Sequence, residues 1–307
     1  MKHILIFGGL GFIGSNIIDE LLPEGEAYDL LVFDFPGMVN GFGSKIRMIY
    51  SDFNNADEVE SVFKNNKIDI VIHLISSTIP ASSNDNIIYD IEANLISSIR
   101  LLDLLVKYKI PKIVFLSSGG TVYGLTESVL VNENHPTLPI SSHGVTKLSI
   151  EKYIHMFHQL YGLNYLILRV GNPYGPHQRS NKQGIINIFL RKIIQYEKLV
   201  VRGDGSAIRD YIYVKDLSYI IKLLLDFNIQ NEIINIGSGQ GISVNQVISI
   251  LKKITPEFEV EYTEPLNSDI PKIVLDTTKV RSLVNFSLCS LDDGIFKTYN
   301  SMLSEIY

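Results

Sequence analysis

Short runs of β-branched and other apolar residues recur along the first half of the chain. Longer segments with apolar residues at helical spacing, such as 86–108 and 143–161, separate them. Strands that alternate with helices are typical of a parallel sheet that is covered on both faces. The pattern therefore predicts an α/β fold built on a doubly wound, Rossmann-type sheet. The predicted strands are "HILIFG", "LLVFDF", "IRMIY", "DIVIHLI", "KIVFLSS" and "NYLILRV".

The alternation becomes less regular after Arg169, where loops such as "NPYGPHQ" and "RGDGSAIRDY" become more frequent. "IINIG" then supplies one more strand-like run. We expect residues 1–169 to form the sheet domain, with a later segment at about 207–237 returning to it. Residues 170–307 then form most of a smaller, interleaved α/β domain. The absence of repeats and flexible linkers predicts two domains that pack closely around a shared cleft.

Composition narrows the possible partners of the protein. The 307 residues are 46% hydrophobic and 20% charged, with a net charge of −6 and a pI near 5.7. An acidic chain without a Lys/Arg cluster is a poor match for nucleic acid or for an anionic membrane, so a small-molecule partner is expected. A single cysteine, Cys289, fits a reducing compartment, and no apolar run is long enough to span a membrane. We expect a cytoplasmic protein.

The first strand leads into a glycine-rich turn, "IFGGLGFIGSN", with glycines at 8, 11 and 14. Such glycines permit a tight turn and a close backbone approach to a pyrophosphate, which the N–H groups at the following helix N-terminus stabilise. Asp34 ends the second strand about 20 residues on, where a carboxylate accepts from the adenosine ribose hydroxyls. The same carboxylate repels a 2′-phosphate. The turn therefore predicts a dinucleotide site that prefers NAD to NADP.

Further motifs along nearly the whole chain resemble the extended short-chain dehydrogenase/reductases, the NAD-dependent nucleotide-sugar epimerase/dehydratase family. These motifs are "SDF" at 51–53, "VIHLIS", "SSGGTVYG", "RVGNPYGPHQ", "VVRGDGSAIRDYIYVKDL", "LDTTKV" and "SLDDGIFKTY". The resemblance implies a sheet domain that binds NAD, a smaller domain that binds a nucleotide sugar, most often a UDP-sugar, and a homodimer. It implies a diphosphate contact from Asn172 and Arg209. The cofactor residues that it implies are Gly8, Gly11, Phe12, Ile13, Gly14, Asp34, Asp52, Phe53, Leu74, Ile75, Asn94, Ser117 and Lys147.

The family carries a Tyr and a Lys four residues apart, so that one helical turn aligns both side chains at the nicotinamide. In "SSHGVTK" the Lys is Lys147, but the Tyr position holds His143. A phenol with an ordinary pKa of about 10 needs strong activation, whereas an imidazole near 6.5 is already mostly neutral at physiological pH. His143 is thus chemically possible as the base. It is also shorter than Tyr, and a misplaced proton acceptor loses much of the rate advantage of general base catalysis.

Two further departures from the family lie nearby. Aligned on "VYG", the family's catalytic hydroxyl falls at Gly119, which leaves Ser118, the preferred candidate, or Thr121 to contact the sugar oxygen. The acidic pair of the 4,6-dehydratases is absent from these positions. Where the epimerases commonly place a diphosphate-binding Arg, the chain has Leu266. Three arginines are candidates to compensate: Arg179, Arg202 and Arg281.

The leading hypothesis is an NAD-dependent nucleotide-sugar 4-epimerase with His143 as acid and base, in a pathway such as polysaccharide biosynthesis. A second hypothesis is a binding protein that has lost catalysis, or a Tyr-to-His variant of an epimerase. A third is another nucleotide-sugar oxidoreductase of the family. No metal site is predicted, because His155 and His158 share a helix face without a third ligand.

Overall fold

The computed structural model describes residues 1–24, 27–264 and 270–304. Its main feature is a seven-stranded sheet of order β10-β6-β5-β4-β1-β2-β3, in which every neighbouring pair is parallel. The prediction of a Rossmann-type sheet is confirmed. The strands are β1 (Lys2–Phe7), β2 (Tyr28–Asp34), β3 (Arg47–Tyr50), β4 (Ile70–His73), β5 (Lys112–Ser118), β6 (Asn164–Val170) and β10 (Glu232–Ile236).

The sheet separates two hydrophobic cores, because successive side chains of a strand point to opposite faces. In β1, Ile4 and Ile6 belong to one core, while Leu5 and Phe7 belong to the other. Strands that are buried on both faces need apolar residues at every position, which explains the uninterrupted apolar runs in the sequence.

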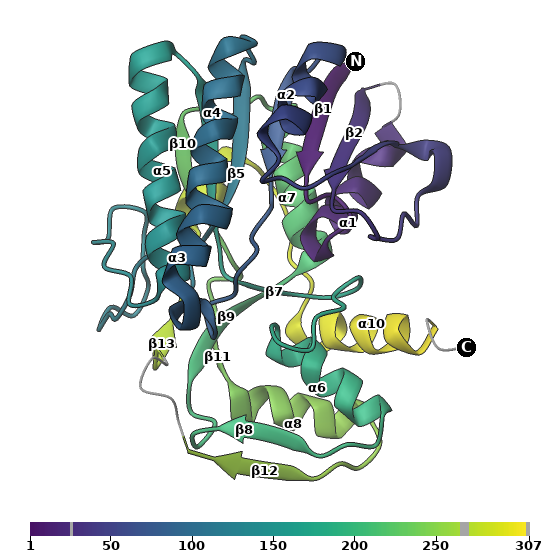
Figure 1. The fold of residues 1–307 in the computed structure, drawn as a ribbon. Coiled ribbons are helices and arrows are strands. Elements are labelled where there is room, and N and C mark those ends of the chain that lie inside the picture. The colour runs from purple at the N-terminus through teal and green to yellow at the C-terminus, as the bar shows by residue number, and fades with distance from the viewer. Residues whose placement is uncertain (25–26, 265–269, 305–307) are drawn as a thin grey trace.

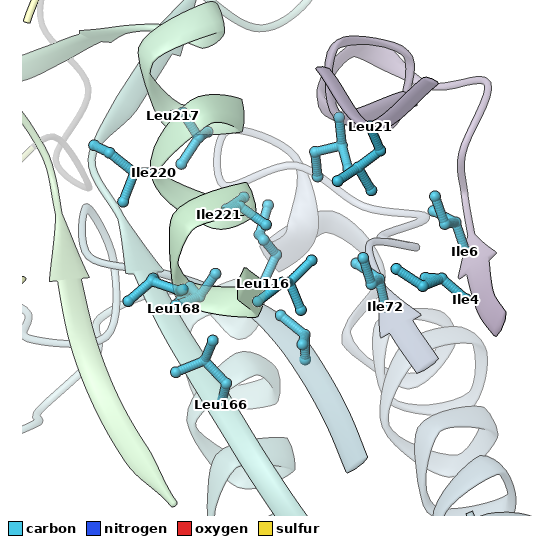
Figure 2. Packing of buried hydrophobic residues seen from close by; sticks show 14 of the residues in the cluster. Ile4, Ile6, Leu21, Ile72, Leu116, Leu166, Leu168, Leu217, Ile220 and Ile221 are labelled. Carbon is cyan, nitrogen blue, oxygen red and sulfur yellow. The ribbon is translucent and has the colours of Figure 1, made fainter. Parts of the chain in front are cut away.

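Different helices cover the two faces. The first core includes side chains from α1 (Phe12–Leu21), α7 (Val214–Asp226) and the short α9 (Thr278–Leu283). In Figure 2, Leu21 of α1 and Ile221 of α7 point toward side chains of the sheet. The second core includes side chains from α2 (Ala56–Asn65), α4 (Ser97–Lys107) and α5 (Ser142–Tyr161), and Figure 1 shows α4 and α5 side by side over this face. Among the described residues, short 3₁₀ turns form η1 (Leu22–Glu24), η2 (Gly43–Lys45) and η3 (Ser83–Asn86).

The sequence suggested one continuous helix over 86–108, but the structure divides it. A short α3 (Ile87–Asp90) passes through a π-helical segment, η4 (Ile91–Ile96), into α4. Apolar spacing does not reveal a π-helical turn, because the turn adds only one residue to the local repeat. Such turns are frequent at functional sites.

A buried ion pair connects α5 to the sheet. Arg169 Nη2 on β6 lies 2.7 Å from Glu151 Oε2 on α5, and both side chains are almost fully buried. Ser117, near the end of β5, also donates to the Glu151 carboxylate. Because breaking a buried pair leaves an uncompensated charge, these bonds hold α5 firmly against β5 and β6.

The smaller part of the molecule lies beyond the carboxyl ends of the strands, at the bottom of Figure 1. Its sheet joins β7 (Asn172–Tyr174), β9 (Ile208–Tyr213), β11 (Gly241–Ser243) and β13 (Lys272–Ile273). A separate pair joins β8 (Leu199–Arg202) to β12 (Val260–Thr263). Between β9 and β11 the chain returns to the large sheet to form α7 and β10. The remaining helices are α6 (Ile185–Ile194), α8 (Val244–Ile254) and α10 (Leu291–Ser304). Within the described ranges, no helix is long and apolar enough to cross a bilayer.

Candidate active site

A cavity of about 680 Å³ lies at the carboxyl ends of the parallel strands, next to the smaller sheet. Strand order reverses here, since β1 has β2 on one side and β4 on the other. Open α/β sheets bind ligands in the crevice at this reversal. The predicted site residues in its wall are Gly8, Gly11, Phe12, Ile13, Gly14, Asp34, Leu74, Ile75, Ser117, Ser118, Thr121, His143, Lys147, Asn172 and Arg209.

The glycine-rich turn brings the N-terminus of α1 to the cavity. Gly8 has a φ of +81°, and Gly11 precedes the helix without any side-chain cap. A Cβ at Gly14 would lie 2.4 Å from the Gly8 carbonyl oxygen, so only glycine allows this close packing of turn and helix. The uncapped N–H groups and the helix dipole suit a pyrophosphate.

Asp34 lies at the end of β2, beside this turn. Its carboxylate accepts from the backbone N–H of Leu10 at 2.7 Å and of Phe35 at 2.8 Å, and the residue is only 9% exposed. Desolvation by burial raises the pKa of the carboxyl above its usual value, although both hydrogen bonds act in the opposite direction. The turn and Asp34 therefore fit the pyrophosphate and the ribose of a dinucleotide.

Three predicted cofactor residues do not line the cavity. Asp52 is exposed, and its side chain accepts from the backbone N–H of Asn54. Phe53 is buried in the second core, where its ring packs against Phe7. Asn94 is buried as well, and its Oδ1 accepts from the N–H of Ser77 at 2.8 Å. Asn94 thus shapes the loop after β4 that forms part of the cavity wall.

The first turns of α5 carry the His and Lys. Ser141 caps the helix by accepting from the N–H of Gly144, and both His143 and Lys147 are buried in the cavity wall. Lys147 Nζ donates to the Leu116 carbonyl at 2.9 Å and lies 4.8 Å from the centre of the Phe115 ring. Desolvation lowers the pKa of Lys147 to about 8, opposed by the charges of Asp90 and Glu151. This placement agrees with the prediction, made from the four-residue spacing, that both side chains reach one site.

His143 is 7% exposed, and its Nδ1 has no hydrogen-bond partner among the described residues. Desolvation, together with the charge of Lys147, lowers the pKa of the imidazole to about 4, although Asp90 acts in the opposite direction. His143 is therefore neutral at physiological pH and can accept a proton.

The hydroxyls near His143 differ in their surroundings. Ser117 is engaged with Glu151, while Ser118 lies in the cavity wall and is partly exposed. Thr121 Oγ1 is buried and, within the described ranges, has no hydrogen-bond partner. A Cβ at Gly119 would lie 2.7 Å from a Leu275 methyl group. Leu275 thus occupies the space that a side chain at position 119 would need.

The substrate side of the cavity carries Asn172 and Arg209. Asn172 Nδ2 donates to the Asp210 carbonyl at 3.3 Å, and Arg209 Nη1 donates to the carbonyl of Ile208. Tyr211, which the sequence motifs did not single out, lines the same region with a buried hydroxyl that lacks a hydrogen-bond partner in the described structure. A buried tyrosine in a β-strand carries no sequence signal that separates a ligand contact from packing.

The prediction for Leu266 falls outside the described residues. The three arginines proposed to compensate for it do not line this cavity. Arg281 stacks on the Phe286 ring, Arg179 lines two neighbouring cavities, and Arg202 ends β8. No group of His, Cys, Asp and Glu side chains in the described part of the chain could hold a metal. His158 Nδ1 instead forms a hydrogen bond with the Leu163 carbonyl oxygen.

Comparison with known proteins agrees with this geometry. The model of the NAD dependent epimerase/dehydratase family matches residues 4–237. The chain belongs to this family. It is 37% identical over 304 residues to a Methanocaldococcus jannaschii protein provisionally named UDP-glucose 4-epimerase, with 97% of this chain and 98% of that protein covered.

Two other similarities extend over almost the full length. A dTDP-4-dehydro-6-deoxyglucose reductase of Escherichia coli is 30% identical, with 97% of each chain covered. The crystal structure of the UDP-glucose 4-epimerase of Thermotoga maritima with UDP-glucose gives a TM-score of 0.92 at 31% identity, covering 100% of both chains. The family predicted from the motifs is confirmed, and its cofactor is NAD.

Replacing Gly14 by Ala tests the cofactor end of the cavity. The added Cβ would meet the Gly8 oxygen and, at 2.6 Å, the Gly9 Cα, so the turn must open. We expect NAD affinity, measured by isothermal titration calorimetry, to fall at least tenfold, or about 1.4 kcal/mol. Gly41→Ala is the matched control, because nothing lies within 4 Å of its added Cβ. Wild-type affinity in Gly14→Ala would contradict this account of the turn.

Proposed function

We propose that this protein is an NAD-dependent nucleotide-sugar 4-epimerase that acts on a UDP-sugar. The observation that carries the proposal is the meeting of the dinucleotide turn, Asp34 and the pair His143 and Lys147 in one cavity. The full-length similarity to a 4-epimerase crystallised with UDP-glucose supports it. A 4,6-dehydratase is disfavoured, because the positions of its acidic pair hold Gly120 and Thr121.

The proposed division of labour follows the two parts of the fold. Residues 1–169 bind NAD, and of the segment predicted to return at about 207–237 only α7 and β10 join this part. Most of 170–307, including β9, binds the nucleotide sugar. Arg209 and Asn172 hold the diphosphate, a role that suits the fixed fork of donors on a guanidinium. NAD, when bound, would accept a hydride from C4 of the sugar and return it to the opposite face of the resulting 4-keto sugar. Lys147 orients the nicotinamide ribose.

His143 moves the proton of the sugar 4-hydroxyl. Its Nδ1 is buried, so Nε2 is the ring nitrogen that accepts this proton as the hydride leaves and returns it afterwards. Imidazole with a pKa near 4 is a weak base, but it is neutral over the whole physiological range. Positioning then decides the rate, because proton transfer needs heavy atoms within hydrogen-bond reach.

We assign different roles to the hydroxyls of Ser118 and Thr121. Ser118, which is partly exposed in the cavity wall, hydrogen-bonds the sugar oxygen. Thr121 has a buried Oγ1 and lies against the first turn of α5, since a Cβ at Gly144 would be 2.9 Å from its carbonyl oxygen. Thr121 Oγ1 and His143 Nδ1, which are buried and have no hydrogen-bond partner in the described ranges, thus belong to packed neighbouring segments. Donation from Nδ1–H to Oγ1 would leave the lone pair of His143 on Nε2.

A homodimer is proposed on the outer face of α4 and α5. Exposed apolar side chains lie on α3, at the end of η4 and along α5, with Ile88 at 65% and Leu160 at 62%. Contiguous exposed apolar residues mark interaction sites. A second copy of the chain is the proposed occupant, because family members of this type form dimers through the corresponding helices. The other members of the exposed set are Ile87, Tyr89, Ile96, Val145, Tyr153, Met156 and Tyr161.

Epimerisation of UDP-glucose and UDP-N-acetylglucosamine, followed against pH, tests the proposed reaction. We expect a plateau bounded by a fall below pH about 4, where His143 becomes protonated, and a fall above pH about 8, where Lys147 loses its charge. His143→Ala should reduce kcat by ~10²–10⁴-fold. Circular dichroism over the same pH range separates titration from unfolding. NAD bound without turnover on any nucleotide sugar would instead favour the binding protein.

Substitutions at the two hydroxyls test their separate roles. Ser118→Ala and Thr121→Val should each lower kcat by ~10–100-fold, the equivalent of one hydrogen bond to a charged group. Thr121→Ser keeps the hydroxyl and should retain wild-type kcat. The measurement is steady-state kinetics of epimerisation. An active Thr121→Val protein would show that His143 does not need Thr121.

Sedimentation velocity tests the dimer. We expect the wild-type chain to sediment as a dimer, and Ile88→Glu with Leu160→Glu to convert it to a monomer, because two charges would then lie in an apolar interface. Phe227→Glu is the control, since Phe227 is likewise an exposed apolar residue, at 65%, but follows α7 on the other face of the sheet. A monomeric wild-type protein would exclude the proposed interface.

A further inference from the structure

Asp90 is a fully buried carboxylate beside the catalytic helix, and none of the sequence motifs includes it. It ends α3, where the π-helical segment η4 begins, and it is 0% exposed. Oδ2 accepts from Ser142 Oγ at 2.6 Å and from Thr146 Oγ1 at 2.8 Å. Oδ1 accepts from Asn94 Nδ2 at 2.9 Å and from the Thr78 hydroxyl.

These four donors connect three parts of the site. Thr78 belongs to the loop after β4 and lines the cavity. Asn94 lies in η4 and also binds the N–H of Ser77 in that loop. Ser142 and Thr146 flank His143 in the first turns of α5, and Thr146 directly precedes Lys147. Asp90 is therefore the junction between the cavity loop and the helix that carries both catalytic side chains.

In the described structure, none of the groups that donate a hydrogen bond to the Asp90 carboxylate is a cation. In the described parts of the chain, its four side-chain donors are three hydroxyls and one amide. Burial disfavours its ionisation, but these bonds outweigh burial and lower the pKa of the carboxyl below its usual value. Asp90 is thus a buried anion whose charge remains available to nearby cations.

Lys147 is the cation that needs this charge. Desolvation destabilises its ammonium group, and the charges of Asp90 and Glu151 oppose that effect. Glu151 already pairs with Arg169, whereas no ion pair of Asp90 occurs in the described part of the chain. Among the described residues, the Lys147 charge also acts on two histidines, His143 on α5 and His73 on β4. Desolvation is the larger cause of their lowered pKa values, and the Lys147 charge is the smaller one. Thr146, which directly precedes Lys147, donates to Asp90 at 2.8 Å and so holds this carboxylate at the same turn of α5. Among the described residues, Asp90 is therefore the carboxylate near Lys147 that has no ion-pair partner.

We propose that Asp90 is a positioning residue, which locks the first turns of α5 onto the cavity loop and supplies the counter-charge that keeps Lys147 protonated beside His143. The proposal rests on the proposed function for its catalytic consequence. Its electrostatic part concerns Lys147 alone and needs no turnover. The two parts can therefore be tested separately.

The deciding experiment measures the titration of Lys147 in the NAD-loaded protein. Lysine labelled with ¹³C at Cε is followed by NMR between pH 6 and 10, and the Lys147 signal is assigned by its loss in Lys147→Met. We expect Asp90→Asn, which keeps the size but removes the charge, to lower the Lys147 midpoint by about one pH unit. An unchanged midpoint in folded Asp90→Asn would overturn the proposal.

Turnover measured on the same samples adds the positioning test. Ser142→Ala removes a donor but keeps the carboxylate, so kcat should fall by about three- to tenfold while the Lys147 midpoint and KM stay unchanged. Ser149→Ala is the control on the same helix, since its hydroxyl only donates to the Val145 carbonyl. It should change neither quantity.

The outcomes distinguish the two proposals. A shifted midpoint in Asp90→Asn together with an inactive wild-type protein supports the role of Asp90 and refutes the epimerase. Should Asp90→Asn not fold, Ser142→Ala decides in its place, and a wild-type kcat in that variant overturns the positioning role.

Discussion

Lys147 is a buried ammonium group at the edge of the sheet, and the arrangement of the site follows from the need to stabilise it. Its Nζ donates to the Leu116 carbonyl and lies over the Phe115 ring, so both contacts come from β5. Isolated charges are costly in an apolar interior, and the negative groups around this one offset that cost. Glu151 lies on α5 itself, whereas Asp90 contacts the first turns of α5 from α3, and their partners extend to β6 and to the loop after β4. The contacts of Lys147 and of the two carboxylates near it thus join α5, β5, β6 and the loop after β4.

The same constraint explains why a His is compatible with the position of the family Tyr. The environment that lowers the pKa of Lys147 also lowers that of His143, since both are buried and close to each other. For a phenol, a neighbouring ammonium group is needed to favour the deprotonated form. An imidazole is already neutral at physiological pH, and a neighbouring ammonium group lowers its pKa further. The exchange of Tyr for His therefore keeps a proton acceptor but lowers its basicity and shortens its reach.

Gly119 and Leu275 show a second departure from the family, next to the cavity-lining residues Ser118 and Gly120. Leu275 occupies the volume that a side chain at position 119 would require, and Leu275 comes from a segment far along the chain. The hydroxyl of the family position is thus absent together with the space for it. Neighbouring hydroxyls at Ser118 and Thr121 remain, one partly exposed and one buried. The chain therefore departs from the family pattern at position 119, while the glycine-rich turn keeps its glycines and Asp34.

The sequence alone determined the features that depend on short stretches of chain. Apolar runs predicted the parallel strands, the glycines with Asp34 predicted a dinucleotide site, and a four-residue spacing placed His143 and Lys147 on one side of a helix. These are local rules of backbone geometry, which hold wherever the segment lies. Tertiary structure alone decided that Asp52, Phe53 and Asn94 stand outside the cavity wall, that Leu275 fills the space at Gly119, and that Asp90 joins the cavity loop to α5. Each of these depends on contacts between distant segments, and packing sets such contacts after the local elements have formed.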